Sequence, residues 1–417
     1  MASSRDDISG GGADGTDKKK KARVAVVGCG GWTQGWHLPN LSHRNDVDVI
    51  ALVDPSSDAP GVGGCTPSLC VSMKELCERH GVSRRYRSVE ELLSSDDELK
   101  LDGVLVAVPH RHHSSVGEAV LKAGKHLLME KPMTADVDEA RSLYELSKDG
   151  RGHGRRLAFL LNNTANWQPG TIAAYDAVSS GRIGAIRHVN CILAAPLGWL
   201  FEGEEHSSWN KVEESGNGTM KGNGFGWGQF SHSFAWIFKV TGLTPSSVFA
   251  KSTKSETTGA DLFDAAIITC TNGCTISASG VGTCPDGGFK VVGNWIFGTG
   301  GMLSYCGLAG SDNVQAVDDD DDGADSNERS AARNRMELWT NDGEHEYGPP
   351  VEFEHLDQDG AGPGSLDAWI RACRGEDYFE GAGAVVGLKA VGAIDAMYRS
   401  FESGKEETVR GCEDLCE

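Results

Sequence analysis

The sequence predicts an α/β protein with an N-terminal, doubly wound parallel sheet and a C-terminal α+β domain built on an open, mostly antiparallel sheet. In the first part of the chain, short apolar segments alternate with helical patterns, as expected when parallel strands are joined by helices. In the second part, strand-like runs follow one another, and Asn272-Gly273 between two of them is a hairpin signal. A glycine-rich turn directly after the first apolar segment is the third observation.

The glycine-rich turn predicts a phosphate-binding loop. Arg23 to Val27 reads as a strand buried on both faces, and Gly28 and Gly30 then occupy the first two glycine positions of G-x-G-x-x-G. The first glycine allows the tight turn, and the second lets a pyrophosphate approach the backbone at a helix N-terminus. Thr33 stands in the third position, so an ordinary strand-to-helix turn remains the alternative. The loop residues predicted to bind the cofactor are Gly28, Gly30, Gly31, Trp32 and Thr33.

An acidic residue follows the second predicted strand at the spacing expected of a dinucleotide site. Asp54 comes directly after Val47 to Val53, 54 − 28 = 26 residues beyond the first glycine. A carboxylate at this place accepts hydrogen bonds from the adenosine ribose. No arginine follows directly, which favours NAD as the cofactor and leaves NADP open. The alternative role for Asp54 is to start a turn before Pro55.

Two further predicted strands end in polar residues. Gly103 to Val108 leads into Pro109, His110 and His113, and His126 to Met129 leads into Glu130 and Lys131. Because ligands bind at the carboxyl ends of parallel strands, we expect all five of these residues on the rim that carries the glycine turn. The histidines are adjacent on a strand-end loop and have no Cys/His partner motif, so we predict no metal site.

Composition and charge restrict the class of protein. A chain of 417 residues is long enough for two domains, and a net charge of −21 argues against nucleic acid and anionic membranes as partners. The 12 scattered cysteines, without a secretory signal, predict reduced thiols and a cytoplasmic protein. The predicted organisation is a disordered tail 1–21, a nucleotide-binding domain 22–162, a second domain 163–405 with an acidic insertion 308–334, and a C-terminal tail 406–417. The lysines at 18–21 fit a solvated charge run better than a nuclear signal.

A helix is predicted from Gln229 to Val240, after the glycine-rich segment 216–228. On this helix Gln229, His232 and Trp236 share one face, which could line a pocket, while Phe230 and Phe234 lie on a second, core-facing side. A hydrogen-bonded core histidine is the alternative interpretation of His232. The second domain also carries several tryptophans, which could stack on sugar rings or simply pack in the core. These tryptophans are Trp199, Trp209, Trp227 and Trp236.

Together these residues resemble the glucose–fructose oxidoreductase/inositol dehydrogenase family, Gfo/Idh/MocA, over roughly residues 22 to 405. Four features carry the resemblance: the glycine turn, Pro109 with His113 four residues on, Glu130-Lys131-Pro132, and His232 after a glycine-rich segment. The resemblance implies a Rossmann domain that binds NAD or NADP, a second domain whose sheet often forms a dimer interface, and a sugar or polyol as substrate.

The resemblance also implies roles for individual residues. Lys131 is expected to contact nicotinamide and substrate, and His232 to act as the acid/base. The substrate contacts predicted from the residues themselves, and not from the resemblance, are Gln229, Trp227 and Trp236. The family frequently has an aspartate four residues before the histidine, and this chain has Gly228 there. A neutral histidine with a pKa near ~6.5 suits proton transfer at neutral pH, and a lysine cation stabilises a developing alkoxide.

The sequence leaves three functions open. The leading one is an NAD(P)-dependent oxidoreductase acting on a secondary alcohol of a sugar, polyol or related small molecule. A second is an NAD-dependent glycosidase of the same fold. A third is a regulatory or scaffold protein that binds the cofactor without catalysis, to which Gly228 gives some weight.

Overall fold

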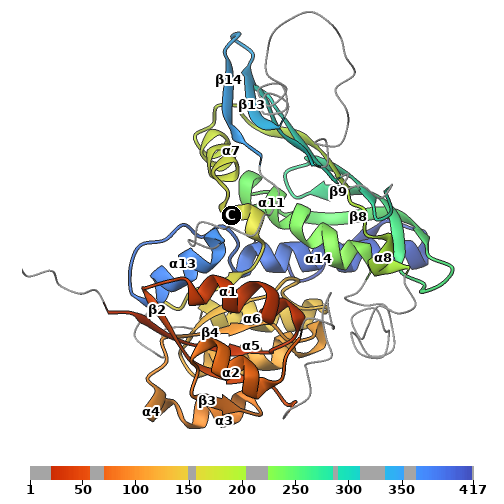
Figure 1. Cartoon of the computed structure of the whole chain (residues 1–417). Helices are drawn as coiled ribbons and strands as arrows, with labels where there is room; N and C mark the ends of the chain where they lie inside the picture. The colour runs from red at the N-terminus through yellow and green to blue at the C-terminus, as the bar shows by residue number, and fades with distance from the viewer. Residues whose placement is uncertain are drawn as a thin grey trace, which may run out of the picture.

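The computed structural model describes residues 20–56, 70–148, 156–202, 224–284, 290–309, 334–351 and 363–415. Most of the acidic insertion, the first part of the glycine-rich segment, Trp209, and nearly all of the predicted N-terminal tail lie outside these residues. The described chain contains two sheets, one near each end of the molecule as drawn (Figure 1).

The first sheet is parallel and has six strands in the order β3-β2-β1-β4-β5-β6. Its central strands are rich in Val, Leu and Ala and are almost completely buried, as expected when helices cover both faces. This order is that of a Rossmann sheet, and the chain reverses direction across the sheet between β1 and β4. The strands are β1 Ala22–Val27, β2 Val47–Val53, β3 Arg84–Tyr86, β4 Gly103–Val106, β5 His126–Met129 and β6 Phe159–Leu161.

Helices connect these strands, and local sequence signals mark several helix ends. Ser72 caps the N-terminus of α2 by accepting a hydrogen bond from the Glu75 amide, and Gly81 ends α2 in the left-handed conformation. Ser88 caps α3 in the same way. The helical segments of this domain are η1 Thr33–His37, α1 Leu38–Ser42, α2 Met73–His80, α3 Val89–Ser94, α4 Asp96–Leu99, η3 His110–His112, α5 His113–Lys122 and α6 Val137–Lys148.

The second sheet has nine strands in the order β14-β13-β12-β11-β7-β10-β9-β8-β15. Neighbouring strands are antiparallel except β7 and β10, which run parallel. The sheet is therefore mostly antiparallel, as predicted. Its strands are β7 Ile186–Ala194, β8 Pro245–Lys254, β9 Asp261–Cys270, β10 Thr275–Val281, β11 Lys290–Gly298, β12 Gly301–Ala309, β13 Arg335–Thr340, β14 His345–Pro350 and β15 Glu407–Thr408.

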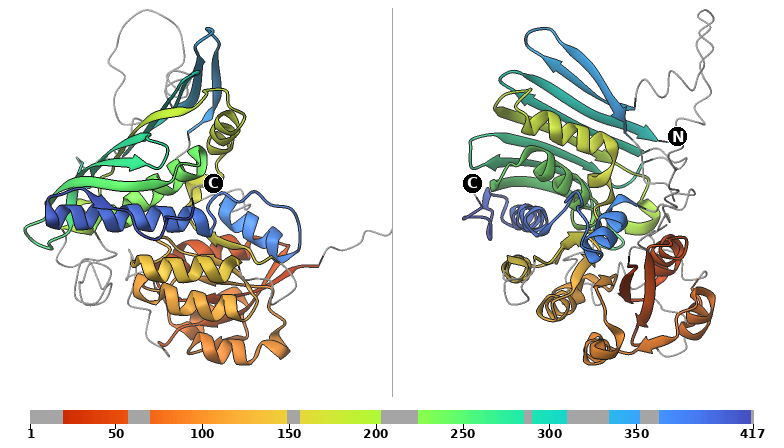
Figure 2. Two further views of the ribbon diagram at one scale, coloured as in Figure 1. Left: turned by 180° about the vertical axis from the view of Figure 1, so that it is seen from behind. Right: turned by 90° about the vertical axis from the view of Figure 1, so that its left-hand side faces the viewer.

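Helices of the second domain cover one face of this sheet and join it to the Rossmann domain. The long helix α14 packs on β8, α11 and α6, and it lies lengthwise between the two sheets (Figures 1 and 2). Helix α13 packs against β5 and β1 of the Rossmann sheet. The helical segments are η5 Thr164–Trp167, α7 Pro169–Ser179, α8 Gly198–Phe201, η6 Gly226–Phe230, α11 Ser231–Thr241, α13 Gly364–Cys373 and α14 Ala384–Ser403.

The predicted fold class is confirmed, and the structure changes several details. The helix predicted from Gln229 is preceded and partly replaced by a π-helical turn, η6, so that α11 begins at Ser231. The strand predicted to end at Val108 ends at Val106. Residues 407–408, assigned above to a tail, form the edge strand β15 beside β8. Strands β3, β13 and β14 were not predicted. Strands β3 and β14 are short, polar segments at the edges of their sheets, and β14 is the hairpin partner of β13.

Candidate active site

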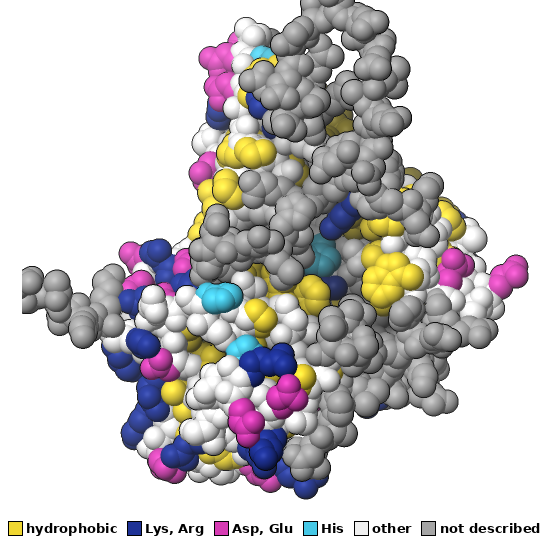
Figure 3. Space-filling view, viewed as in Figure 1, with side chains coloured by type: hydrophobic (Ala, Val, Ile, Leu, Met, Phe, Trp, Pro, Cys, Tyr) yellow, Lys and Arg dark blue, Asp and Glu magenta, His cyan; other side chains and the backbone are white. Residues whose placement is uncertain are grey.

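A cavity of about 870 Å³ lies where the carboxyl ends of the Rossmann strands face the nine-stranded sheet. Its lining includes Gly28 and Asp54 from the Rossmann domain and His232 and Tyr305 from the second domain. In the space-filling view, His, Lys and Arg side chains are visible in the hollow between the two parts of the molecule (Figure 3). Four of the five predicted strand-end residues, Pro109, His110, Glu130 and Lys131, therefore share one rim with the glycine turn.

The glycine turn approaches the end of β4 too closely for any side chain. Gly28 has a φ of +89°, and a Cβ added there would stand 2.3 Å from the carbonyl oxygen of Ala107. Thr33, in the third glycine position, closes the loop because its hydroxyl donates to the Gly28 carbonyl at 2.6 Å. Gly30, Trp32 and Thr33 line the cavity, whereas Gly31 is buried outside its lining. Four of the five loop residues that were predicted to bind the cofactor thus line the cavity.

Asp54 is held at the cavity rim by two backbone amides. Its Oδ2 accepts from the Cys29 amide and its Oδ1 from the Ser56 amide, both at 2.9 Å. The carboxylate therefore connects β2 to the glycine turn. Arg87, which follows β3, also lines this end of the cavity, and its guanidinium contacts the Pro55 carbonyl at 3.4 Å. The sequence analysis missed this arginine because it is 33 residues from Asp54 (87 − 54 = 33), and only the pairing of β2 with β3 brings it to the same end of the cavity.

The residues after β4 divide into two groups. Pro109 and His110 line the cavity, as predicted for cofactor contacts. His113 is fully buried away from it, and its two ring nitrogens lie 2.8 Å from the Pro132 carbonyl and 3.0 Å from the Val108 carbonyl. His113 thus ties the end of β4 to the segment that follows Lys131, which makes it a positioning residue and not a cofactor contact.

Glu130 is the centre of a buried hydrogen-bond network. Its Oε1 accepts from Trp32 Nε1 at 2.8 Å and from Asn162 Nδ2 at 2.7 Å, and it lies 2.8 Å from His37 Nε2. Burial by itself raises the pKa of this carboxyl, but the hydrogen bond and charge of His37, with Lys131 and Asn162, bring it down to about 2. Glu130 is therefore an ionised anchor for the residue that follows it.

Lys131 reaches from the Rossmann domain into the second domain. Its Nζ donates to the Gly228 carbonyl at 3.0 Å, and both Lys131 and His232 line the cavity. Gly228 precedes His232 by four residues and lies in the middle of η6, whereas His232 is the second residue of α11. The backbone carbonyl of residue 228 thus meets the lysine at the position where the resemblance led us to expect an aspartate. The structure brings the two predicted catalytic residues to one site.

His232 is partly exposed to the cavity and has few negative charges nearby. Burial lowers its pKa well below the usual value, and the cations Lys131 and Lys290 lower it further, while Glu130 opposes them. The imidazole is therefore neutral at neutral pH and available as a proton acceptor. A fully enclosed core histidine, the alternative above, is not what the structure shows.

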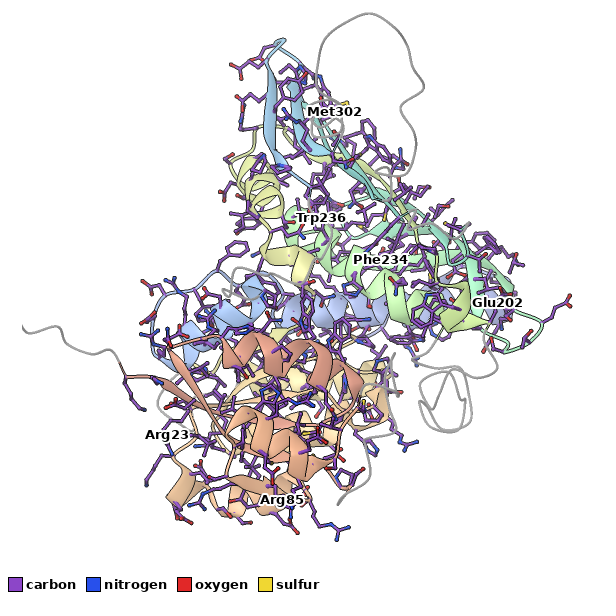
Figure 4. The ribbon with its side chains drawn as sticks, viewed as in Figure 1. Arg23, Arg85, Glu202, Phe234, Trp236 and Met302 are labelled. Carbon is purple, nitrogen blue, oxygen red and sulfur yellow. The ribbon has the colours of Figure 1, made fainter. Side chains whose placement is uncertain are left out.

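The three predicted substrate-binding residues differ in their placement. Gln229 and Trp236 line the cavity, and the Trp236 indole N–H donates to the Thr171 hydroxyl at 2.9 Å. Trp227 is 1% exposed, packs against Tyr398 with ring centroids 5.8 Å apart, and is not part of the lining. Trp227 is therefore a core residue, because the π-helical turn η6 directs it inward. Figure 4 labels Trp236 and Phe234 on α11, which is drawn between the nine-stranded sheet above and the Rossmann domain below.

The structure adds polar lining residues that the sequence analysis did not find. Tyr305 on β12 packs against Trp236 in a tilted arrangement, with ring centroids 4.6 Å apart, and its hydroxyl donates to Gln168 Oε1 at 2.9 Å. Asn294 and Lys290 project from β11 into the same cavity. No local pattern marks these residues as functional, since their common location depends on strand pairing between β11 and β12.

The cavity fits a nicotinamide dinucleotide. It runs from Asp54 and the glycine turn, where an adenosine and a pyrophosphate would bind, to Lys131 and His232, where a reactive ring would lie beside a substrate. Residue 28 has no room for a side chain, as is typical of the first glycine in a dinucleotide-binding loop. Among the described residues, no cluster of three or more His, Cys, Asp or Glu could hold a metal ion, and no helix has the length and apolar character needed to cross a bilayer.

The first domain is thus a dinucleotide-binding Rossmann domain. Residues 22–152 match the model of the oxidoreductase family with an NAD-binding Rossmann fold, GFO_IDH_MocA. The nucleotide-binding domain of this chain belongs to that family, which confirms the resemblance found in the sequence.

Individual relatives are similar over part of the chain. An uncharacterized oxidoreductase of Schizosaccharomyces pombe is 29% identical over 166 residues, 40% of each chain. The 1,5-anhydro-D-fructose reductase of Ensifer adhaerens is 30% identical over 136 residues, 30% of this chain and 37% of its own. The first three curated relatives are matched over 40 to 54% of their own lengths, so the chain spans about half of them.

Solved structures agree with the whole described fold. Levoglucosan dehydrogenase in complex with NADH and levoglucosan superposes with a TM-score of 0.68 at 15% identity, covering 94% of this chain and 100% of that one. At this identity the likeness shows the shared two-domain fold alone.

Proposed function

We propose that this protein is an NAD(P)-dependent oxidoreductase that transfers hydride between nicotinamide and a secondary alcohol of a sugar, polyol or related small molecule. One observation carries the proposal. A single cavity joins the glycine turn and Asp54 to Lys131 and His232, and the Lys131–Gly228 hydrogen bond holds the lysine against the residue four positions before the histidine. A cofactor loop, a cation and a neutral base together are what alcohol oxidation requires.

The residues of the chain have distinct roles in this proposal. When bound, the nicotinamide dinucleotide supplies the hydride acceptor or donor. Gly28, Gly30 and Asp54 hold its pyrophosphate and adenosine ribose. The Lys131 ammonium donates a hydrogen bond to the reacting oxygen and stabilises its negative charge, and a ring nitrogen of His232 takes the hydroxyl proton. Glu130 supports Lys131 through the network with Trp32, His37 and Asn162.

The substrate end of the cavity supports a polyhydroxylated ligand. Gln229, Asn294 and Tyr305 line it with amide and hydroxyl groups, and the Trp236 ring, although only 2% exposed, adds an apolar side chain to the same lining. This mixture suits the hydroxyls and the apolar faces of a sugar. The names of relatives agree, since they include an anhydrofructose reductase and the inositol 2-dehydrogenase of Corynebacterium glutamicum.

The direct test is a screen of sugars and polyols with NAD⁺ and NADP⁺, followed by nicotinamide absorbance. We expect cofactor reduction with at least one alcohol, and its loss in Lys131→Met with cofactor binding retained. A glycosidase would instead cleave glycosides without net cofactor turnover, which product analysis detects. Tight cofactor binding with neither activity over the full panel would favour the regulatory or scaffold function.

We further propose that the protein assembles as a homo-oligomer through the outer face of its nine-stranded sheet. Phe249, Phe263 and Ile267 on β8 and β9 are 40%, 43% and 53% exposed, which is unusual for large apolar side chains grouped on one face. Light scattering should show an oligomer, and Ile267→Lys should shift it toward monomer.

A cytoplasmic location, without nucleic-acid or membrane partners, remains a prediction that fractionation of cells would test.

A further inference from the structure

A buried carboxylate on β9 holds the start of the π-helical turn η6. Asp261, the first residue of β9, is 1% exposed. Its Oδ2 accepts a hydrogen bond from the Gly226 amide and its Oδ1 from the Tyr398 hydroxyl, both at 2.7 Å. The Trp227 amide in turn donates to the Tyr398 hydroxyl oxygen at 3.4 Å. The first two amides of η6 are therefore bound by side chains from the nine-stranded sheet and from α14.

Two glycines allow the backbone before and in η6 to lie directly on these side chains. A Cβ added at Gly224 would stand 1.7 Å from Oδ1 of Asp261 and 2.3 Å from the Tyr398 hydroxyl oxygen. A Cβ added at Gly226 would stand 2.9 Å from the Tyr398 ring. Any side chain at these positions would push the carboxylate or the tyrosine away. This close approach is the structural reason for glycine at the end of the segment 216–228.

The protonation states favour the same arrangement. Burial, and next the negative charge of Asp261, raise the pKa of the Tyr398 hydroxyl well above its usual value, so Tyr398 keeps the proton that it donates. Asp264 on the same strand is 3% exposed, and burial and the charge of Asp261 raise its pKa to about 9. Asp264 is therefore uncharged at neutral pH, and Asp261 carries the negative charge of this pair of acids.

The turn η6 connects this anchor to the active site. The Gly228 carbonyl, two residues after Gly226, accepts from Lys131 Nζ at 3.0 Å, and α11 with His232 directly continues η6. The resemblance led us to expect an aspartate side chain at position 228. A side chain can change its rotamer to follow the lysine, whereas a backbone carbonyl stays where the turn places it. The position of η6 therefore decides where Lys131 finds this acceptor.

We propose that Asp261 and Tyr398 are positioning residues for the reaction, because they fix η6 so that the Gly228 carbonyl holds the Lys131 ammonium beside His232. Neither Asp261 nor Tyr398 is among the described residues that line the cavity, so both act through the backbone of η6. The inference rests on the function proposed above for the role of Lys131. It adds how a chain without an acid at position 228 keeps the lysine in place.

The first test measures the pKa of Lys131 in the full-length protein, by NMR of lysines labelled by reductive methylation, with Lys131→Met to assign the signal. A carbonyl acceptor favours the ammonium form, so displacement of Gly228 should lower this pKa, by about one pH unit for one hydrogen bond. We expect this decrease in Gly224→Ala and in Tyr398→Phe, which keeps the ring whose centroid lies 5.8 Å from that of Trp227. Neither substitution changes the charge of the protein, so the decrease cannot come from a lost charge.

Asp395→Asn is the matched control. Asp395 on α14 is also a buried aspartate that accepts from two donors, the guanidinium groups of Arg399 and Arg410, and the hydrogen bonds described for it do not reach η6. Asp261→Asn should lower the pKa of Lys131, whereas Asp395→Asn should leave it unchanged. Urea unfolding of both variants shows whether they lose similar stability, which separates a displaced lysine from a general weakening of the fold.

The second test measures turnover with an alcohol found in the screen. Tyr398→Phe and Gly224→Ala should lower kcat by about 10–100-fold, because the ammonium is misplaced, and should leave the affinity for NADH unchanged. Asp395→Asn should retain full turnover. Tyr398→Phe removes a single oxygen atom, so it decides both tests even if Gly224→Ala does not fold.

The outcomes separate the two proposals. An unchanged pKa of Lys131 in Tyr398→Phe, an equal decrease in Asp395→Asn, or a lower pKa with unchanged kcat would each overturn the inference and keep the proposed function. Absence of turnover by the wild type over the full panel would reject the proposed function. The NMR titration would even then decide whether Asp261 and Tyr398 position Lys131.

Discussion

The close approach of the glycine turn to β4 predicts how much folding stability is lost when a methyl group is added at Gly28. In Gly28→Ala, the residue keeps a φ of +89°, and its new Cβ meets the Ala107 carbonyl oxygen at 2.3 Å. The left-handed conformation costs about 1–2 kcal/mol for a residue with a side chain. Relief of the overlap adds about 1–3 kcal/mol, since the facing atoms are backbone and β4 is buried. We therefore expect a loss of about 2–5 kcal/mol in the free energy of unfolding.

Gly81→Ala is the matched control for this prediction. Gly81 has a φ of +66°, and nothing lies within 4 Å of the position that its new methyl group would take, so its substitution carries only the conformational cost of about 1–2 kcal/mol. Urea unfolding of both variants measures the difference, and NADH titration shows whether the displaced loop still binds. Equal destabilisation of the two variants would refute the reasoning, because the contact with Ala107 would then cost nothing.

Four further predictions follow from the site. NADH should bind more tightly than NADPH because Asp54 repels a 2′-phosphate, and equal calorimetric affinities would exclude this role. Gly30→Val should abolish dinucleotide binding while circular dichroism shows an intact fold; a folded variant with unchanged affinity would make the loop a plain turn. Lys131→Met and His232→Ala should each reduce turnover by about 10²–10⁴-fold, less than additively when combined, and full turnover of His232→Ala would remove the histidine from the mechanism. Gly228→Asp should raise the pKa of His232. The rate of alcohol oxidation falls at low pH where the imidazole protonates, so this acidic limb of the pH–rate profile should move to higher pH. An acidic limb at unchanged pH would contradict the prediction.

Local patterns in the sequence predicted most of the residues that the Rossmann domain contributes to the cavity. A parallel sheet brings the carboxyl ends of its strands to one edge, so residues that directly follow a strand are placed by their position in the chain. For this reason Asp54, Pro109, His110 and Lys131 were found by pattern, and all four line the cavity. The same reasoning was wrong for His113, which is four residues beyond Pro109 and turns into the core.

The second domain was predicted less completely, because its site residues come from neighbouring elements that are distant in sequence. Lys290, Asn294 and Tyr305 reach the cavity only through the register of β11 with β7 and β12. Strand β7 itself pairs in parallel with β10, whose paired residues are 87 positions further along the chain (275 − 188 = 87). The π-helical turn before α11 likewise decided that Trp227 packs inward while Gln229 faces the cavity.

The sequence by itself determined the class of fold and the glycine turn, since each depends on residues close together in the chain, whereas Lys131 and His232 were singled out as the catalytic pair through a family resemblance. Only the tertiary structure decided which further residues line the cavity, such as Arg87 at the end that carries Asp54 and Lys290 on β11, and which three groups hold Glu130. The physical reason is that strand periodicity specifies which face a residue occupies, whereas the pairing of distant strands and the packing of two domains specify what that face meets.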